Sequence, residues 1–423
     1  MNISRYDPAP HCHSPKCSEA ARGVARPGLR EGLRTGRLKT GKCDFPSSSC
    51  LQSSCLVFLF RCGFAALLSL FLPATAARAD APPLPTRLPR TNLLADHNLQ
   101  GEVLLGKSKS DWQKRRAEIL QGMQSVMGPL PGKDRRCPLD PQIGEDVDCG
   151  IYVRRFITYA AEPGGRVPAW LLIPKTALHA KKRLPAVLAL HPTDMEYGHR
   201  VVVEPLRASY RAYGHDLAER GYVVLAPAYP LMAQYQPNLK ALGYQSGTMK
   251  AIWDNLRGLD FLESLPCVKR GKFGAIGHSL GGHNAIYTAV FEPRIAAVVS
   301  SCGFDSYLNY FDGDQANWQP GRGWCQDRYL PKLAGYRGRL QDIPFDFQEM
   351  IGALAPRPVF INAPHSDANF KWRSVDAIVN AAMPVYRLYG VPQNLRVEHP
   401  DCEHDFPPQI RDEAYRFLNA HLR

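Results

Sequence analysis

Six short, almost entirely apolar runs in the second half of the chain are the feature that most constrains its fold. Helical stretches such as YRAYGHDLAERG and SGTMKAIWDNLRGLDFLESL separate most of them. A strand without polar alternation is covered on both faces, and alternating strands and helices build a parallel sheet. The pattern predicts an α/β fold with a mostly parallel, doubly wound sheet and helices on both faces. The runs are PAVLALH, GYVVLAP, KFGAIGHS, RIAAVVSS, RPVFINAP and LRVEHP.

The third run leads into the pentapeptide GHSLG (residues 277–281), which fits G-x-S-x-G. This pattern forms a nucleophile elbow when it follows a strand and opens a helix. Residues 273–276 are typical of a strand and residues 282–290 of a helix, so the context is right. The two glycines suit a strained turn in which a Cβ would clash. Ser279 is therefore predicted to be a nucleophile. The alternative is a glycine-rich turn with an inert serine.

A serine nucleophile needs a base and a third group that orients the base. In this architecture an acid and then a histidine follow the serine, each after a later strand. Asp367 follows RPVFINAP and His404 follows LRVEHP. Because ligands bind at the carboxyl ends of the strands in open α/β sheets, we expect both side chains near Ser279.

Neighbouring residues are weaker alternatives for these two roles. His399 falls inside the last apolar run, so its side chain is expected to be packed or to face outward. Asp376 falls too far into the next helix. The remaining alternatives are His365, Asp401 and Asp405, which share loops with the predicted partners.

An oxyanion hole needs two N–H groups aimed at the developing negative charge. Leu280, directly after the nucleophile, is expected to supply one backbone N–H. The loop after the first apolar run reads HPTD, and Pro192 has no N–H to donate. Thr193 is therefore the candidate for the second donor. Its hydroxyl could instead cap the loop.

Aromatic residues are concentrated in a long insertion, residues 304–332, between two core strands. Such an insertion is typical of a pocket wall or lid, and Trp318, Trp324 and Tyr329 are the candidate pocket residues. The alternative is that these side chains pack the insertion onto the body. His283, four residues after Ser279, is expected to be packed.

Three further elements are predicted before and between these motifs. Residues 110–128 have apolar positions at helical spacing, with Ser110 as N-cap. Residues 151–160 and 167–175 form an antiparallel pair around Glu-Pro-Gly-Gly. A helix over residues 247–264 has Ser246 as its candidate cap.

Residues 56–80 are typical of a secretory signal peptide. Arg61 precedes an apolar run over residues 63–72, and Ala-Arg-Ala then ends at Ala79, which predicts cleavage before Asp80. The run is too short to span a bilayer, so no stable membrane anchor is expected after cleavage. Residues 1–55, a basic stretch that is rich in Gly, Pro and Ser, are either a long n-region or lie upstream of the true start. We divide the chain into a leader (1–79), a linker (80–109) and a catalytic domain (110–423).

The net charge of +13 divides between the leader and the rest of the chain. Residues 1–79 hold 11 Lys/Arg and 4 Asp/Glu, or +7, which leaves +6 for the other 344 residues. No basic run or RNA-binding signature accompanies this excess, so nucleic acid is not an expected partner.

Six cysteines follow the predicted cleavage site. An even number in an exported protein permits disulfides, and Cys137–Cys149 is the favoured pair, with buried free thiols as the alternative. No C-x-x-C spacing occurs among them, so no zinc site is predicted. The six are Cys137, Cys149, Cys267, Cys302, Cys325 and Cys402.

The chain resembles the α/β-hydrolases, and among them the dienelactone-hydrolase and acetyl-xylan-esterase-like enzymes. The stretches that carry the resemblance are RVPAWLLIPK, PAVLALHPT, GYVVLAPAY, GAIGHSLGGHNA, APRPVFINAPHSDANF and CEHDFP. The resemblance implies the same nucleophile, acid and base: Ser279, Asp367 and His404. Dienelactone hydrolases use cysteine at the elbow, so serine here favours ordinary ester hydrolysis. Pro192 also stands where a glycine is common.

These observations predict a secreted or periplasmic serine esterase that works through an acyl-enzyme and needs no metal or cofactor. Acylated plant or algal polysaccharide is the expected substrate class, with the acyl group, the alcohol and the oligomeric state left open. One rival is a prolyl-oligopeptidase-like peptidase, although that family usually places a large β-propeller before the hydrolase domain and only about thirty residues lie between Asp80 and the first predicted helix. The other rival is a catalytically silent ligand-binding homologue.

Overall fold

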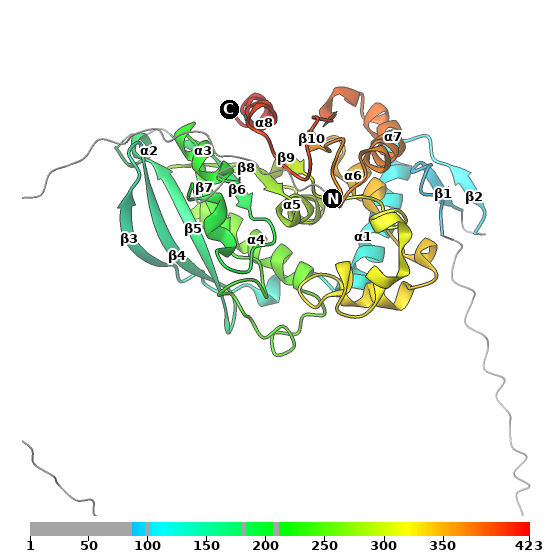
Figure 1. The fold of residues 1–423 in the computed structure, drawn as a ribbon, viewed down its shortest axis with the longest axis horizontal. Helices are drawn as coiled ribbons and strands as arrows, with labels where there is room; N and C mark the ends of the chain where they lie inside the picture. Colours follow the sequence, from blue (N-terminus) through cyan, green and yellow to red (C-terminus); the bar gives the residue numbers. More distant parts are fainter. Residues whose placement is uncertain (1–86, 99–100, 180–182, 206–210) are drawn as a thin grey trace, which may run out of the picture. The chain divides into compact units, whose positions relative to one another are not determined.

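A nine-stranded sheet organises the part of the chain that the computed structural model describes, residues 87–98, 101–179, 183–205 and 211–423 (Figure 1). Its strand order is β11-β10-β9-β8-β6-β7-β5-β4-β3. Six strands run parallel, and they are the six apolar runs of the sequence. The predicted mostly parallel sheet is therefore confirmed. The six are β6 (Leu184–Leu190), β7 (Val223–Pro227), β8 (Val268–His278), β9 (Ile295–Ser301), β10 (Val359–Asn362) and β11 (Leu395–Glu398).

Three antiparallel strands extend the sheet beyond β7. They are β3 (Gln142–Asp148), β4 (Tyr152–Glu162) and β5 (Gly165–Pro174). The last two are the antiparallel pair predicted around Glu-Pro-Gly-Gly. A separate two-stranded sheet pairs β1 (Ala95–His97) with β2 (Val103–Leu105) near the start of the described chain.

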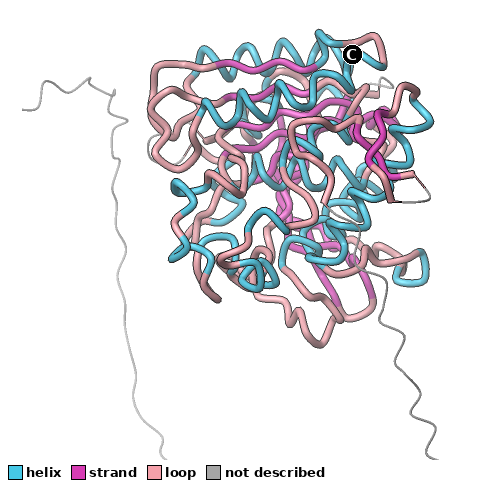
Figure 2. Tube along the Cα trace, turned by 90° about the vertical axis from the view of Figure 1, so that its right-hand side faces the viewer, coloured by secondary structure: helices cyan, strands magenta, loops and turns pink. Residues whose placement is uncertain are grey.

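Helices cover both faces of the large sheet (Figures 1 and 2). One apolar core lies under α3 (Tyr213–Glu219) and α8 (Pro408–Leu422). The larger core lies on the other face, under five helices. None of the helices in the described ranges is long and apolar enough to cross a lipid bilayer. The five helices are α1 (Lys109–Met127), α4 (Gly247–Ser264), α5 (Leu280–Phe291), α6 (Phe347–Leu354) and α7 (Trp372–Leu388), and the short α2 (Lys175–His179) follows β5.

Capping side chains determine where two of the predicted helices begin. The Ser246 hydroxyl accepts a hydrogen bond from Met249 N at 3.0 Å, which confirms the predicted start of α4. The predicted cap Ser110 is wrong, because Ser108 caps α1 instead. Ser108 Oγ accepts from Asp111 N, and the Asp111 carboxylate accepts from Ser108 N, both at 3.1 Å. This reciprocal pair satisfies two donors that Ser110 could not reach.

The disulfide predicted between Cys137 and Cys149 is also wrong, because all six described cysteines are free thiols. The seven residues of β3 lie between the two sulfurs. An extended strand rises about 3.4 Å per residue, whereas a disulfide needs Cα atoms within about 7 Å. The strand therefore holds the two cysteines too far apart.

The aromatic-rich insertion lies between β9 and β10, as predicted. It is built from short 3-10 turns and leads into α6, without any further strand. The turns are η3 (Tyr310–Gly313), η4 (Gln315–Trp318), η5 (Gly323–Cys325), η6 (Pro331–Tyr336) and η7 (Leu340–Asp342).

Candidate active site

Ser279 lies on a sharp turn between β8 and α5. Its backbone has φ 54° and ψ −122°, a conformation that side chains rarely adopt. A Cβ added at Gly277 would lie 2.1 Å from the Gly281 carbonyl carbon, and one added at Gly281 would lie 1.9 Å from Leu190 O. The turn is therefore possible only with glycine at both ends, and it lifts the serine hydroxyl out of the sheet.

Ser279, His404 and Asp367 form one continuous chain of hydrogen bonds. His404 Nε2 lies 2.9 Å from Ser279 Oγ, and His404 Nδ1 lies 2.9 Å from Asp367 Oδ2. A carboxylate only accepts hydrogen bonds, so the imidazole proton belongs on Nδ1. The lone pair on Nε2 then faces the serine hydroxyl. The structure thus brings together the three residues that the sequence singled out.

Asp367 is held rigidly by its own loop. Its side chain is buried, and its Oδ1 accepts hydrogen bonds from Asn369 N at 2.8 Å and Phe370 N at 3.2 Å. These bonds leave Oδ2 free to face His404. Two backbone N–H bonds of this kind fix the direction of the carboxylate.

A small pocket of about 170 Å³ opens beside the serine hydroxyl. Thr193 and Leu280, the two candidates for oxyanion donors, both border it. So do Trp324 and Tyr329 from the insertion, and the Tyr329 hydroxyl lies 3.1 Å from Thr193 Oγ1. The other lining residues are Ser279, Tyr310, Phe311, Gly323, Gln326, Asn369 and Phe370.

Trp318 does not border this pocket. It is fully buried, with its ring edge-on to Tyr307 and Tyr310 inside the insertion. The sequence grouped it with Trp324 and Tyr329 as a candidate pocket residue. That prediction is wrong for Trp318, because the structure packs its ring within the insertion.

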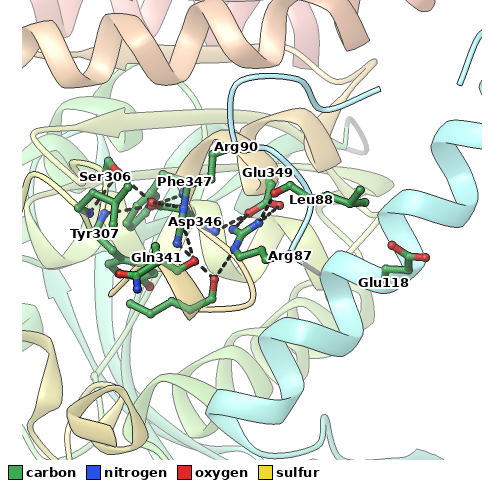
Figure 3. A network of polar contacts seen from close by, with 12 residues as sticks. Arg87, Leu88, Arg90, Glu118, Ser306, Tyr307, Gln341, Asp346, Phe347 and Glu349 are labelled. Atoms are coloured by element: carbon green, nitrogen blue, oxygen red, sulfur yellow. Dashed lines mark hydrogen bonds and ion pairs between the residues drawn. The ribbon is translucent and has the colours of Figure 1, made fainter. Parts of the chain in front are cut away.

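A buried ionic network anchors the start of the insertion to the first described residues of the chain (Figure 3). Asp346, which caps α6, accepts hydrogen bonds from Ser306 Oγ at 2.8 Å and Tyr307 N at 3.1 Å. Its ion-pair partner is Arg90, 3.2 Å away. Arg87 binds Glu349 through both guanidinium nitrogens, at 2.6 and 3.0 Å. Residues 87–90 therefore hold in place the segment that leads into the pocket wall.

The other histidines lie in different surroundings. His399 follows β11 rather than lying within it, and it binds Asp376 at 2.8 Å and Ala363 O at 2.6 Å. His365 stacks on His399 and lies tilted against Trp372, and it does not border the pocket. His283 is fully buried against Trp324 and is therefore packed, as expected.

One group in the described part of the chain has the composition of a metal site. Cys302, Asp367 and His404 each place one ligand atom within 4.8 Å of the others. Two of these residues already bind each other at 2.9 Å. The group therefore coincides with the hydrogen-bonded chain to Ser279 and does not form a separate centre.

Sequence reasoning missed several residues of the site. Asn369 and Phe370 hold the Asp367 carboxylate and line the pocket, while Gln326 supplies a polar group to the pocket wall. The Asp-x-Asn spacing of residues 367–369 is the signal that could have revealed the first, because an aspartate often accepts from the amide two residues on. Nothing in the pattern distinguishes Gln326.

Comparisons with known proteins find similarity to glucuronoyl esterases. A family model described as "Glucuronyl esterase, fungi" matches residues 239–390. The 4-O-methyl-glucuronoyl methylesterase 1 of Wolfiporia cocos is 25% identical over 398 residues, which cover 85% of this chain and 90% of that protein. A glucuronoyl esterase from Solibacter usitatus superimposes with a TM-score of 0.62 at 18% identity, over 78% of this chain and 97% of that one. One from Caldicellulosiruptor kristjansonii gives 0.56 at 17%, over 78% and 89%.

The fold and its structural relatives define this protein as an α/β-hydrolase. Within that class it is a carboxylic-ester hydrolase, and its resemblance to the serine esterases of the superfamily is confirmed.

Proposed function

We propose that Ser279, His404 and Asp367 form the catalytic triad of an exported serine esterase. Ser279 Oγ attacks the ester carbonyl carbon while His404 Nε2 takes the hydroxyl proton. The tetrahedral intermediate collapses to an acyl-enzyme as the imidazolium returns that proton to the leaving alcohol. Water, activated by the same imidazole, then releases the acid. The hydrogen-bonded chain of two 2.9 Å contacts is the observation that carries this proposal.

Asp367 supports both steps by keeping the proton on His404 Nδ1 and by stabilising the imidazolium. The backbone N–H groups of Leu280 and Thr193 serve as oxyanion donors, since both residues border the pocket beside the serine hydroxyl. Leu280 opens α5, so the positive end of the helix dipole adds to the stabilisation.

We propose a uronic acid ester within a polysaccharide as the substrate. Several of the relatives are 4-O-methyl-glucuronoyl methylesterases by name, and in such an ester the sugar's own carboxyl group is the acyl part. The pocket is small and offers Trp324 and Tyr329 for contact with a sugar ring, with Gln326 and Asn369 as hydrogen-bonding side chains. A sugar unit would then occupy the acyl pocket and the alcohol would leave toward solvent.

The first test uses purified protein from Asp80 onward, which retains Arg87 and Arg90. Hydrolysis of p-nitrophenyl acetate and of a glucuronic acid methyl ester is followed beside a Ser279→Ala variant, with fluorophosphonate labelling. Both turnover and labelling should vanish in the variant. They should persist in Ser264→Ala, a control serine at the far end of α4.

The relative rates identify the substrate class. Preference for the uronate ester supports the proposal, whereas preference for acetyl esters points to the deacetylation of sugars. Cleavage of amides alone would favour the peptidase rival. A wild-type protein that neither turns over nor labels would leave only the ligand-binding rival.

Export rests on the predicted signal peptide, which lies outside the described residues. N-terminal mass spectrometry of the protein from an expressing cell should find Asp80 as the first residue. An intact leader on the mature protein would contradict export by this route.

A further inference from the structure

His404 lies in an irregular loop, residues 399–407, that belongs to no helix or strand. The 2.9 Å contact to Ser279 therefore depends on what holds this loop. On the N-terminal side of His404, the loop that carries Asp367 holds the His404 loop through backbone hydrogen bonds. His365 N donates to Pro400 O at 3.0 Å and Ser366 N donates to Cys402 O at 3.1 Å.

The C-terminal side of His404 is held by side chains at the ends of two strands. Asn362, the last residue of β10, donates from Nδ2 to the Asp405 carbonyl at 2.9 Å. Cys302, just after β9, donates a weaker S–H bond to the same oxygen at 3.3 Å. Because a carbonyl only accepts hydrogen bonds, the amide atom that faces Asp405 must be the nitrogen.

The same amide also reaches back toward the nucleophile. Asn362 Nδ2 donates to Ser301 Oγ at 2.8 Å, and Ser301 Oγ lies 3.0 Å from His278 Nδ1. His278 immediately precedes Ser279, and burial holds its pKa well below the ordinary value for histidine. Nδ1 of a neutral imidazole can accept a hydrogen bond from the Ser301 hydroxyl. The hydrogen bonds from His278 through Ser301 and Asn362 to the Asp405 carbonyl therefore form one polar chain. It joins the residue before the nucleophile to the residue after the base.

The three side chains that link these contacts, His278, Ser301 and Asn362, are buried. An asparagine at such a position is not a favourable way to stabilise a core. Its other amide atom, Oδ1, is buried and has no hydrogen-bond partner within the described ranges. Leaving a buried amide oxygen without a hydrogen bond carries a cost in stability. An apolar residue of the same shape would avoid that cost, which points to a role for the two Nδ2 bonds beyond stability.

We propose that Asn362 is a positioning residue for His404, which holds the base at hydrogen-bonding distance from Ser279 by binding the Asp405 carbonyl. The inference rests on the proposed function, because it assigns His404 as the base. Asn362 does not border the pocket, so its contribution should fall on kcat and not on KM.

The test compares Asn362→Leu with a matched control, Asn255→Leu. Asn255 is also a buried asparagine whose Nδ2 makes two bonds, to Asn284 Oδ1 at 3.2 Å and Thr288 Oγ1 at 2.9 Å, but it lies between α4 and α5. Asn362→Leu should lower kcat and the fluorophosphonate labelling rate by about 10- to 100-fold, with KM within threefold. Asn255→Leu should lose similar Tm with kcat nearly unchanged. Equal kcat losses in the two variants would overturn the proposal.

A second comparison asks whether Asn362 acts through His404. In a His404→Ala background, Asn362→Leu should cause no further loss of kcat, because there is no base left to position. A loss by the same factor in both backgrounds would mean that Asn362 acts elsewhere, and the proposal would fail.

Asn362→Asp preserves shape and gives a test by pH. The ionised carboxylate would face the Asp405 carbonyl with no proton to donate, whereas the protonated acid regains one donor. The ratio of variant to wild-type kcat should therefore rise as the pH falls. A ratio that does not change with pH would contradict the proposal.

The proposed function and this inference can fail separately. A wild-type protein that fluorophosphonate does not label would contradict the proposed function. This inference would still be tested by the low-field NMR resonance of the His404 Nδ1 proton. That signal should be present in wild type and lost in Asn362→Leu, and its persistence in the variant would refute the positioning role.

Discussion

Two histidines that lie five residues apart in the sequence each bind an aspartate, yet only one of them reaches the candidate nucleophile. His404 binds Asp367 at 2.9 Å, and His399 binds Asp376 at 2.8 Å. The difference lies at the second ring nitrogen. In His404 it faces the Ser279 hydroxyl at 2.9 Å, whereas in His399 it faces the Ala363 carbonyl at 2.6 Å.

This difference determines what each imidazole can do. A carbonyl and a carboxylate both accept hydrogen bonds, so the two partners of His399 both call for an N–H. No lone pair is then directed at a substrate. His404 has one acceptor and one hydroxyl as partners, which leaves Nε2 able to take a proton. A histidine–aspartate contact alone therefore does not identify a catalytic base.

The strongest test of this comparison replaces each histidine by glutamine. Because glutamine cannot take up a proton, His404→Gln should lower kcat for ester hydrolysis by about a millionfold, the scale seen when a triad histidine is removed. His399→Gln should leave kcat within about twofold, since its ring faces no hydroxyl. Comparable losses in the two variants would break the distinction between the pairs.

Replacing the acids should give the next largest effect. In Asp367→Asn the amide would donate toward His404 Nδ1 and force the proton onto Nε2, where it blocks proton transfer from Ser279. We expect kcat to fall roughly ten-thousandfold with the fold intact. Steady-state kinetics would measure the fall in kcat, and circular dichroism would show whether the fold is intact. Full activity in this variant would show that the tautomer is set by another group.

A histidine with no acidic partner extends the comparison to pH. His283 is buried between Trp324 and Tyr287, neither ring nitrogen has a partner in the described part of the chain, and burial lowers its pKa to about 3. Below pH 6.5 His283 takes up a proton in the unfolded chain, whereas in the folded protein it stays neutral until the pH approaches 3. Stability should therefore fall as the pH drops from 6.5 toward 3.

His283→Phe should remove this proton uptake while keeping a flat ring between the two aromatics. The slope of unfolding free energy against pH should then decrease by about 1.4 kcal/mol per pH unit between pH 6 and 4. Chemical denaturation at several pH values measures it. An unchanged slope would show that His283 is protonated in the folded state.

The smallest effect is expected at the non-catalytic pair. The side chains of His399 and Asp376 are 19% and 36% exposed, so solvent screens their attraction. Asp376→Asn should lower the free energy of unfolding by about 0.2–1 kcal/mol and leave kcat unaltered. A loss of kcat with no loss of stability would mean that this pair also supports the site.

Much of the fold follows from local pattern. Apolar runs without polar alternation can be satisfied only by burial on both faces, and the six runs all became parallel strands. The cap at Ser246 follows the same logic, because its hydroxyl bonds a backbone amide three residues away. The cap at Ser108 was missed because Ser108 and Ser110 both precede a helical pattern, and only the carboxylate at Asp111 distinguishes them.

The pocket wall shows where such reasoning ends. Trp318 and Trp324 lie in the same insertion with similar neighbours, yet the first is buried among Tyr307 and Tyr310 and the second borders the pocket. Their orientation depends on 3-10 turns that are anchored through Asp346 to Arg90, more than 250 residues away in sequence. No local pattern contains that contact.

The sequence by itself determined the parallel sheet, the strained elbow at Ser279 and the order of serine, acid and histidine. Each depends on short-range chemistry: apolar periodicity, two glycines where a Cβ cannot fit, and strand ends that meet at one edge. The tertiary structure decided how the His404 ring is directed at the serine hydroxyl and which aromatics line the pocket. Those side chains lie in irregular loops, where direction is set by distant partners such as Asn362 at the Asp405 carbonyl.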